Sequence, residues 1–236
     1  MSVQPPMSSH PVRASRPLAS GEIALVGTVH MDREGYRALR DLLVALAPSS
    51  IATEMSGFGT DFRRRTGRQI QAAIRRYLRR ARIPWARAGE PAATIMLLRF
   101  PFEYVAARRA ARRLGVPVVN LGRDRDSAAW LMPIARGAWD AARCAGLAAA
   151  PRDLGAELAA VRSRALGLEV SGIRPGPRDR ILARRIKELT VPAGSVAVVL
   201  GWEHLAPGVS RNVAWILQGQ EVRAYLVVGG EAHQLR

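Results

Sequence analysis

Short runs of apolar residues alternate along the chain with longer stretches in which apolar residues recur every three or four positions. The short runs are rich in β-branched residues and are bounded by turn residues, which is typical of strands buried in a parallel sheet. Strands are predicted at 23–26, 50–53, 116–121, 196–200 and 221–228. Helices are predicted at about 33–47, 61–82, 92–114, 125–144, 152–165, 178–190 and 205–218. This alternation predicts an α/β fold with a central, mostly parallel sheet flanked by helices.

Two of the predicted strands end in the same pattern, Gly-x-x-His. One is Gly27-Thr28-Val29-His30, and the other is Gly201-Trp202-Glu203-His204. A third strand leads directly into Glu54. The carboxyl ends of strands in open α/β sheets face the ligand crevice, so we expect these three side chains on one rim. Two histidines and a glutamate suit either a divalent metal or acid–base catalysis.

Further charged residues follow a strand or begin a helix. Arg123 and Asp124 follow the strand at 116–121, and Arg178 and Asp179 begin a helix. Each pair is either a local salt bridge or cap, or a device that holds an anionic group or orients a ligand histidine. Glu103 alone resembles a surface acid on an apolar-sided helix.

Several common catalytic signatures are missing from the sequence. It has no Walker phosphate loop, no G-x-G-x-x-G after a strand, no G-x-S-x-G elbow and no H-E-x-x-H. Their absence argues against nucleotide hydrolases, Rossmann dehydrogenases and serine hydrolases. What is left is a histidine and carboxylate site, which activates water either on a metal or with one histidine as general base.

The length of 236 residues suits one domain. Residues 1–20 are rich in Ser, Pro and Arg and lack the apolar centre of a signal peptide, so we predict a disordered basic tail before a single domain over 21–236. With no apolar run near 18 residues and a single cysteine, Cys144, we expect a cytoplasmic protein without transmembrane helices or disulfides. His10 in the tail and His233 beyond the last predicted strand are expected to be bystanders.

The chain is strongly basic, with 36 Lys and Arg against 19 Asp and Glu and a net charge of +17. Such a charge indicates either an anionic partner, such as nucleic acid or a membrane surface, or an arginine-rich composition whose charges are simply solvated. The basic helix at about 61–82 is accordingly either a solvated face or an anion-binding flap. The arginines are spread along helices, and the aromatic residues do not interleave with them as base-stacking platforms would. Both observations favour the second interpretation, an arginine-rich composition with solvated charges.

The motifs, taken in order, resemble the TraB/GumN/Tiki family, which is more distantly related to the erythromycin esterases and ChaN-like proteins. The segments that carry the resemblance are Leu25–His30, Ile51–Met55, Phe102–Ala107, Gly115–Asp124, Arg178–Ala183 and Gly201–Gly208. They span about residues 22–228. The chain departs from the family pattern at Gly122, where the first Asp of Asp-Arg-Asp is common, and at Pro177, where Glu usually precedes Arg178.

This resemblance implies an α/β fold with one active-site rim and, in Tiki-type members, metal-dependent hydrolysis of peptide bonds. It implies that His30, Glu54 and His204 are the metal or catalytic positions, holding a divalent ion such as manganese, cobalt or zinc. It further implies supporting roles for Glu103, Arg123 and Arg178. A helical insertion over about 60–115 is then a candidate cover for the site.

We therefore expect a hydrolase of the TraB/Tiki type that acts on an amide or ester bond of a small molecule or peptide. The alternative is a non-catalytic pocket protein that binds an anionic ligand or partner through its arginine faces. A metal carrier or sensor is a third reading of the same residues.

Overall fold

The computed structural model describes residues 10–11, 16–85, 88–138, 154–167, 176–206 and 209–235. The chain divides into two compact units. The first, called the sheet unit, comprises residues 1–54, 102–121 and 160–236, and the second, called the helical unit, comprises residues 55–101 and 122–159.

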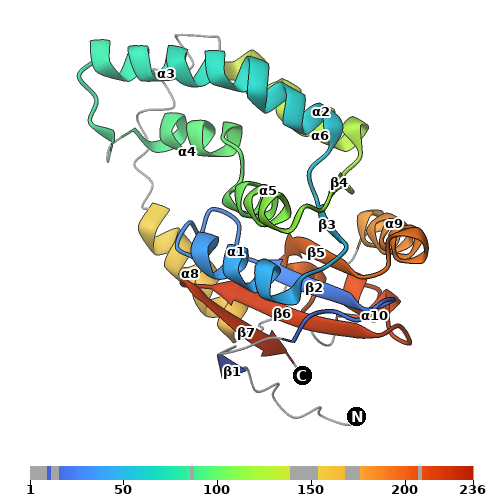
Figure 1. The fold of residues 1–236 in the computed structure, drawn as a ribbon. Helices are drawn as coiled ribbons and strands as arrows, with labels where there is room; N and C mark the ends of the chain where they lie inside the picture. The colour runs from blue at the N-terminus through green and yellow to red at the C-terminus, as the bar shows by residue number, and fades with distance from the viewer. Residues whose placement is uncertain are drawn as a thin grey trace. The chain divides into compact units, whose positions relative to one another are not determined.

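The sheet unit is built on one sheet with the strand order β1-β7-β6-β2-β5-β3-β4 within the described residues (Figure 1). The strands are β1 (His10–Pro11), β2 (Ile23–Thr28), β3 (Ser50–Thr53), β4 (Val118–Asn120), β5 (Val196–Gly201), β6 (Val222–Val228) and β7 (Glu231–Leu235). The five strands from β6 to β4 run parallel, whereas β7 and β1 are antiparallel additions at one edge. The predicted α/β fold with a mostly parallel sheet is confirmed.

Helices cover the sheet closely enough that every residue of β2 and β5 is buried. Alternate residues of a strand point to opposite faces, and Ala24 and Val26 of β2 pack in one apolar cluster with α1 (Gly35–Leu46) and α5 (Phe102–Leu114). Helix α9 (Pro177–Ala193) contacts β5 and the short α10 (Val213–Ile216). The remaining helix, α8, covers Leu154–Leu166.

The register of the central strands brings three strand ends together. Thr28 of β2 lies opposite Gly201 of β5, and Thr53 of β3 lies opposite Val199 of β5. The order β2-β5-β3 therefore places the residues that follow these strands at one edge of the sheet.

The C-terminal edge of the sheet differs from the prediction. His233 does not lie beyond the last strand, because β6 turns back through Gly229-Gly230 into β7, which contains this histidine. Both glycines have positive φ, at +59° and +89°, as a two-residue type I′ hairpin requires. The helix predicted at 205–218 is shorter than expected: among the described residues of that range only Val213–Ile216 are helical, forming α10, and a 3₁₀ turn at Trp202–His204 comes before the range.

The helix predicted over 92–114 is in fact two helices. Helix α4 (Gly89–Leu98) ends before Pro101, and α5 begins just after it. A proline disfavours helical backbone at the residue before it, which separates the two helices. Helix α5 belongs to the sheet unit, whereas α4 belongs to the helical unit.

The helical unit has its own apolar core. The predicted basic helix at 61–82 consists of α2 (Gly57–Phe62), a π-helical turn (Arg63–Gly67) and α3 (Arg68–Arg80). These elements pack with α4 and α6 (Asp124–Ala138), and their core includes Ile70, Ile74 and Leu78. The predicted helix at 125–144 is α6 as far as 138, and residues 139–144, with Cys144, lie outside the described residues. Across the described part of the chain, none of the helices combines the length and apolarity that a membrane span needs.

Parts of the segment predicted to be a disordered tail belong to the sheet unit. Residues His10 and Pro11 pair with β7. Leu18 lies in the core, and Arg16 forms an ion pair with Glu22.

Candidate functional site

Three adjacent parallel strands each deliver one polar side chain to the same edge of the sheet. His30 follows β2, Glu54 follows β3, and His204 ends the 3₁₀ turn that follows β5. All three belong to the sheet unit. The structure therefore brings together the two Gly-x-x-His ends and the glutamate that the sequence places on one rim.

Both ring nitrogens of His204 face carboxylates. Its Nδ1 lies 2.7 Å from Asp179 Oδ1, and its Nε2 lies 3.1 Å from Glu54 Oε1. Burial opposes protonation of the ring, but the hydrogen bonds to Asp179 and Glu54 outweigh it and raise the pKa of His204 to about 10. His204 is therefore an imidazolium near neutral pH, with both N–H groups already donated.

Asp179 is held in place by the start of α9. Its Oδ2 accepts the N–H of Gly176 at 2.9 Å, while Oδ1 accepts from His204. Burial alone would raise the pKa of Asp179, but the hydrogen bonds from His204 and Gly176 outweigh this effect and lower it. The residue is thus both the helix cap and the group that orients His204, two roles that the sequence left as alternatives.

Glu54 is a largely buried carboxylate held by three groups. Its Oε1 accepts from His204 and forms an ion pair with Arg178 Nη2 at 2.9 Å, and its Oε2 accepts the N–H of Gly201 at 2.6 Å. Burial alone would raise the pKa of Glu54, but its contact with His204 and the charges of Arg178 and His30 lower it to about 2. Glu54 is therefore ionised throughout the physiological pH range.

His30 differs from His204 because, among the described residues, only one of its ring nitrogens has a hydrogen-bond partner. Nδ1 lies 2.5 Å from Glu103 Oε1, and 59% of the side chain is exposed, against 16% for His204. Neighbouring protein atoms disfavour the charged ring, but the hydrogen bond to Glu103 and the charges of Glu103, Glu54 and Glu203 raise the pKa of His30 to about 9.

The other nitrogen of His30 lies beside Gly201. A Cβ placed on Gly201 would lie 3.1 Å from His30 Nε2, 2.9 Å from Glu203 Oε2 and 3.6 Å from Glu54 Oε2. The bare Cα of Gly201 therefore borders a narrow space between one imidazole and two carboxyl groups, in which even a methyl group would press on Glu203.

A tight turn presents His30 to this space. The Val29 carbonyl accepts the N–H of Asp32 at 3.1 Å, and Met31 within the turn has a left-handed φ of +69°. This conformation disfavours a residue with a side chain by about 1–2 kcal/mol. Asp32 holds the far end of the turn, because its buried carboxylate accepts the N–H of Gly229 and pairs with Arg162. Strained backbone of this kind is commonly found at functional sites.

The donors in this arrangement do not fit a metal held by His30, Glu54 and His204. His204 would have to lose a proton from a doubly hydrogen-bonded ring, and the ion would lie close to the Arg178 guanidinium. In the described parts of the chain, no group of three or more His, Cys, Asp and Glu side chains is arranged to hold a metal ion. The manganese, cobalt or zinc ion implied by the family resemblance stays a prediction.

The other predicted site residues have different surroundings. Glu103 and Arg178 contact His30 and Glu54 directly, as described above. Arg123 belongs to the helical unit, where its guanidinium forms two hydrogen bonds of 2.7 Å with Asp126 at the start of α6. Glu203 and the Gly201 N–H are site groups that were not predicted from the sequence. Glu203 lies within the second Gly-x-x-His motif, directly before His204, so its position in the sequence could have indicated a place at the site.

Comparison with known proteins gives no relative. No protein-family model matches the chain, and no curated protein or solved structure matches it significantly. The resemblance to the TraB/GumN/Tiki family stays a prediction based on the motifs.

Proposed function

We propose that this protein hydrolyses an ester or amide bond with His30 as general base. The observation that carries the proposal is the placement of His30, whose Nδ1 is held by Glu103, whose side chain is 59% exposed and whose Nε2 lies beside Gly201. An oriented imidazole with one free nitrogen is what water activation needs.

In the proposed reaction, neutral His30 removes a proton from water at Nε2 as the water oxygen attacks the carbonyl carbon. Glu103 accepts the Nδ1–H and stabilises the imidazolium that forms. The imidazolium then gives the proton to the leaving alcohol or amine as the C–O or C–N bond breaks. The products are a carboxylic acid and an alcohol or amine, so atoms and protons balance.

The second histidine has a different role in this proposal. His204 and Arg178 hold Glu54 in its ionised form, and Glu54 accepts a backbone N–H at the site. The Arg178 side chain is 57% exposed, so its guanidinium also reaches solvent, where it can stabilise negative charge developing on a substrate oxygen.

The proposal is tested with chromogenic esters and fluorogenic peptides on the purified protein. His30→Ala should lower kcat/KM by about 10²–10⁴-fold, the usual contribution of a general base. His233→Gln, which changes a histidine of β7, is the matched control and should retain activity at a temperature at which both variants are folded. Undiminished hydrolysis by His30→Ala would refute the assignment.

A metal-dependent form of the same hydrolysis is tested separately. The metal content of the purified protein is measured by elemental mass spectrometry beside a His30→Ala, His204→Ala double variant. Near-stoichiometric manganese, cobalt, iron or zinc that is lost in the double variant would place both histidines on one ion. Hydrolysis without bound metal would instead support His30 acting alone. We further propose, as the sequence predicts, a small-molecule or peptide substrate and a cytoplasmic location.

A further inference from the structure

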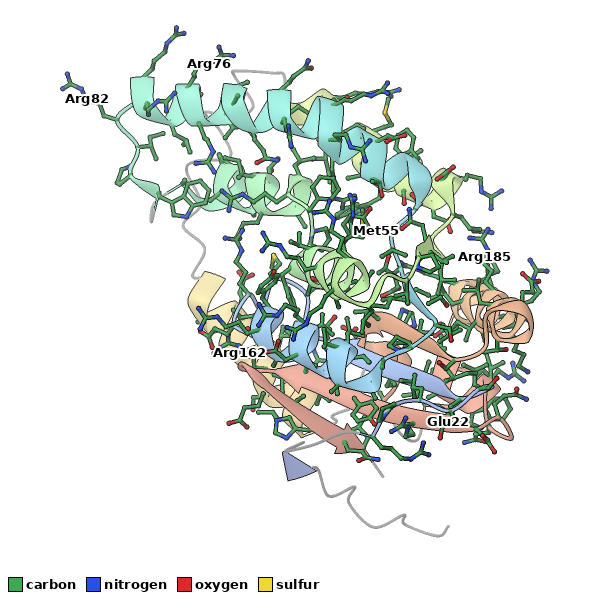
Figure 2. All side chains as sticks on the ribbon, viewed as in Figure 1. Glu22, Met55, Arg76, Arg82, Arg162 and Arg185 are labelled. Carbon is green, nitrogen blue, oxygen red and sulfur yellow. The ribbon has the colours of Figure 1, made fainter. Side chains whose placement is uncertain are left out.

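Helix α3 of the helical unit presents a stripe of arginines on the side opposite its buried residues. Ile70, Ile74 and Leu78 lie in the core of the unit. The exposed arginines recur at the spacing of one helical face, and they are Arg68, Arg76, Arg79 and Arg80, here called the arginine stripe. At 1.5 Å per residue, the stripe extends along about 18 Å of helix. Figure 2 shows Arg76 pointing away from the helix and Arg82 projecting just beyond its end.

The charge on this surface is not neutralised locally. Residues 62–85 contain nine arginines and no acidic residue, and Asp61 just before them pairs with Arg64 at 3.4 Å. Within the described residues, none of the four arginines of the stripe forms a salt bridge. A concentrated positive charge without intramolecular partners favours an external polyanion.

An exposed tryptophan lies beside Arg75, which precedes Arg76 of the stripe on α3. The Trp85 side chain is 47% exposed, and the Arg75 guanidinium carbon lies 5.7 Å from the centroid of its ring. Arg75 belongs to α3, so the fold brings together an aromatic ring and an arginine that are ten positions apart in the sequence.

We propose that the arginine stripe and Trp85 form a binding surface for single-stranded nucleic acid. The guanidinium groups contact the phosphates, and the indole offers a flat surface on which a base can stack. An anionic membrane fits the observations less well, because the apolar side of α3 is occupied by the core of the unit and cannot insert into lipid. This surface lies wholly in the helical unit and does not depend on the proposed hydrolysis.

The first test compares two fourfold variants of the full-length protein. One replaces the arginines of the stripe by glutamine (R68Q, R76Q, R79Q, R80Q). The matched control replaces four exposed arginines of α5 (R108Q, R109Q, R112Q, R113Q), so the net charge changes equally. Binding of a fluorescein-labelled oligo(dT) of about 20 nucleotides, longer than a typical single-domain site, is measured by anisotropy over a range of salt concentrations.

The unmodified protein should bind the oligonucleotide with an affinity that falls as salt rises. Each phosphate contact on a single strand contributes about 0.7 to the slope of log K against log salt. The stripe variant should therefore flatten the slope by about 3, whereas the α5 control should change it by less than about 1. Equal changes in the two variants, or no binding by the unmodified protein, would overturn the proposal.

The second test concerns the tryptophan. Trp85→Ala should weaken oligonucleotide binding by between about fivefold and a hundredfold without changing the salt slope, and Trp85→Phe should restore much of the loss. Unchanged affinity in Trp85→Ala would contradict base stacking. Tighter binding to phosphatidylserine vesicles than to the oligonucleotide, at equal salt and with no effect of Trp85→Ala, would assign the arginine stripe to a membrane surface instead.

Discussion

His30 and His204 stand in the same local sequence pattern, and their neighbours give them different chemistry. Carboxylates occupy both nitrogens of His204, whereas His30 has one nitrogen bound and the other beside Gly201. A histidine that is charged and doubly hydrogen-bonded holds other groups in place. A histidine with an accessible nitrogen can exchange protons with a substrate.

The raised pKa of His30 sets the expected pH dependence of hydrolysis. A general base must be neutral, so kcat/KM should rise about tenfold per pH unit and level off near the pKa of about 9. Glu103→Gln removes the charge that raises this pKa, so the rising limb should move to lower pH. Measurement of kcat/KM against pH for both proteins checks this. A limb that stays in place in Glu103→Gln would contradict the role of Glu103.

Gly201 permits a direct test of the space beside His30. Its φ of −60° and ψ of 142° suit alanine, so Gly201→Ala should leave the free energy of unfolding within about 1 kcal/mol of the unmodified protein. The added methyl group would lie 2.9 Å from Glu203 Oε2 and 3.1 Å from His30 Nε2, so it should displace these groups and lower kcat/KM by about tenfold or more. Gly57→Ala, whose Cβ would have ordinary contacts in the helical unit, is the control. Full activity in Gly201→Ala would place the reacting water elsewhere.

The His204 network should make stability depend on pH in a defined window. The pKa of His204 is raised from 6.5 to about 10, so its stabilising contribution is complete below about 6.5 and is lost as pH rises through 10. Glu54, with its pKa lowered to about 2, contributes fully above about 4.5 and loses its contribution as pH falls through 2.

His204→Ala should therefore lower the free energy of unfolding by about 1–3 kcal/mol near pH 6, the usual consequence of leaving buried polar groups without a partner. The difference from the unmodified protein should shrink near pH 10, where the ring is losing its proton. Urea unfolding of both proteins at pH 6 and pH 10 measures this difference in the free energy of unfolding. A difference that grows with pH would show that the ion pairs with Asp179 and Glu54 do not stabilise the fold.

At the scale of elements, single prolines and glycine pairs determine helix and strand boundaries that apolar periodicity does not show. Apolar periodicity continues from α4 into α5, and only Pro101 indicates that the helix is interrupted. The pair Gly229-Gly230 is a hairpin signal, and β7 follows from it. These signals are present in the sequence, but they compete with longer and more regular patterns.

Helix α2 depends on one polar cap. The Ser56 hydroxyl oxygen accepts the N–H of Gly59 at 2.9 Å and lies 2.8 Å from the Ser127 hydroxyl of α6. Ser56→Ala should destabilise the helical unit by about 1 kcal/mol, as loss of an N-cap usually does. Hydrogen exchange should show faster amide exchange in α2 with little change in the sheet. Uniform loss of protection across both units would contradict a local role for this cap.

At the scale of the whole molecule, the sequence is sufficient to predict the parallel sheet and the rim that joins His30, Glu54 and His204. The apolar runs that form the strands, and the polar residues that follow them, are enough to predict this edge, because adjacent parallel strands end together. The partners of the histidines are harder to predict. Glu103 lies 73 residues from His30, and Asp179 lies 25 residues from His204, on helices whose packing depends on the complete fold. The two units are also interleaved in sequence, so neither of them is one continuous segment of the chain.

The two-residue strand β1 has a consequence for the behaviour of the protein at high concentration. It pairs with β7, the antiparallel strand at that end of the sheet. Without β1, the backbone groups of His233 and Gln234 would also be free to pair with a strand of another molecule, which is a common route to aggregation. Removal of residues 1–15 should therefore cause concentration-dependent self-association, detectable by light scattering, while the proposed hydrolytic site stays intact. On this view, the N-terminal segment keeps neighbouring molecules apart.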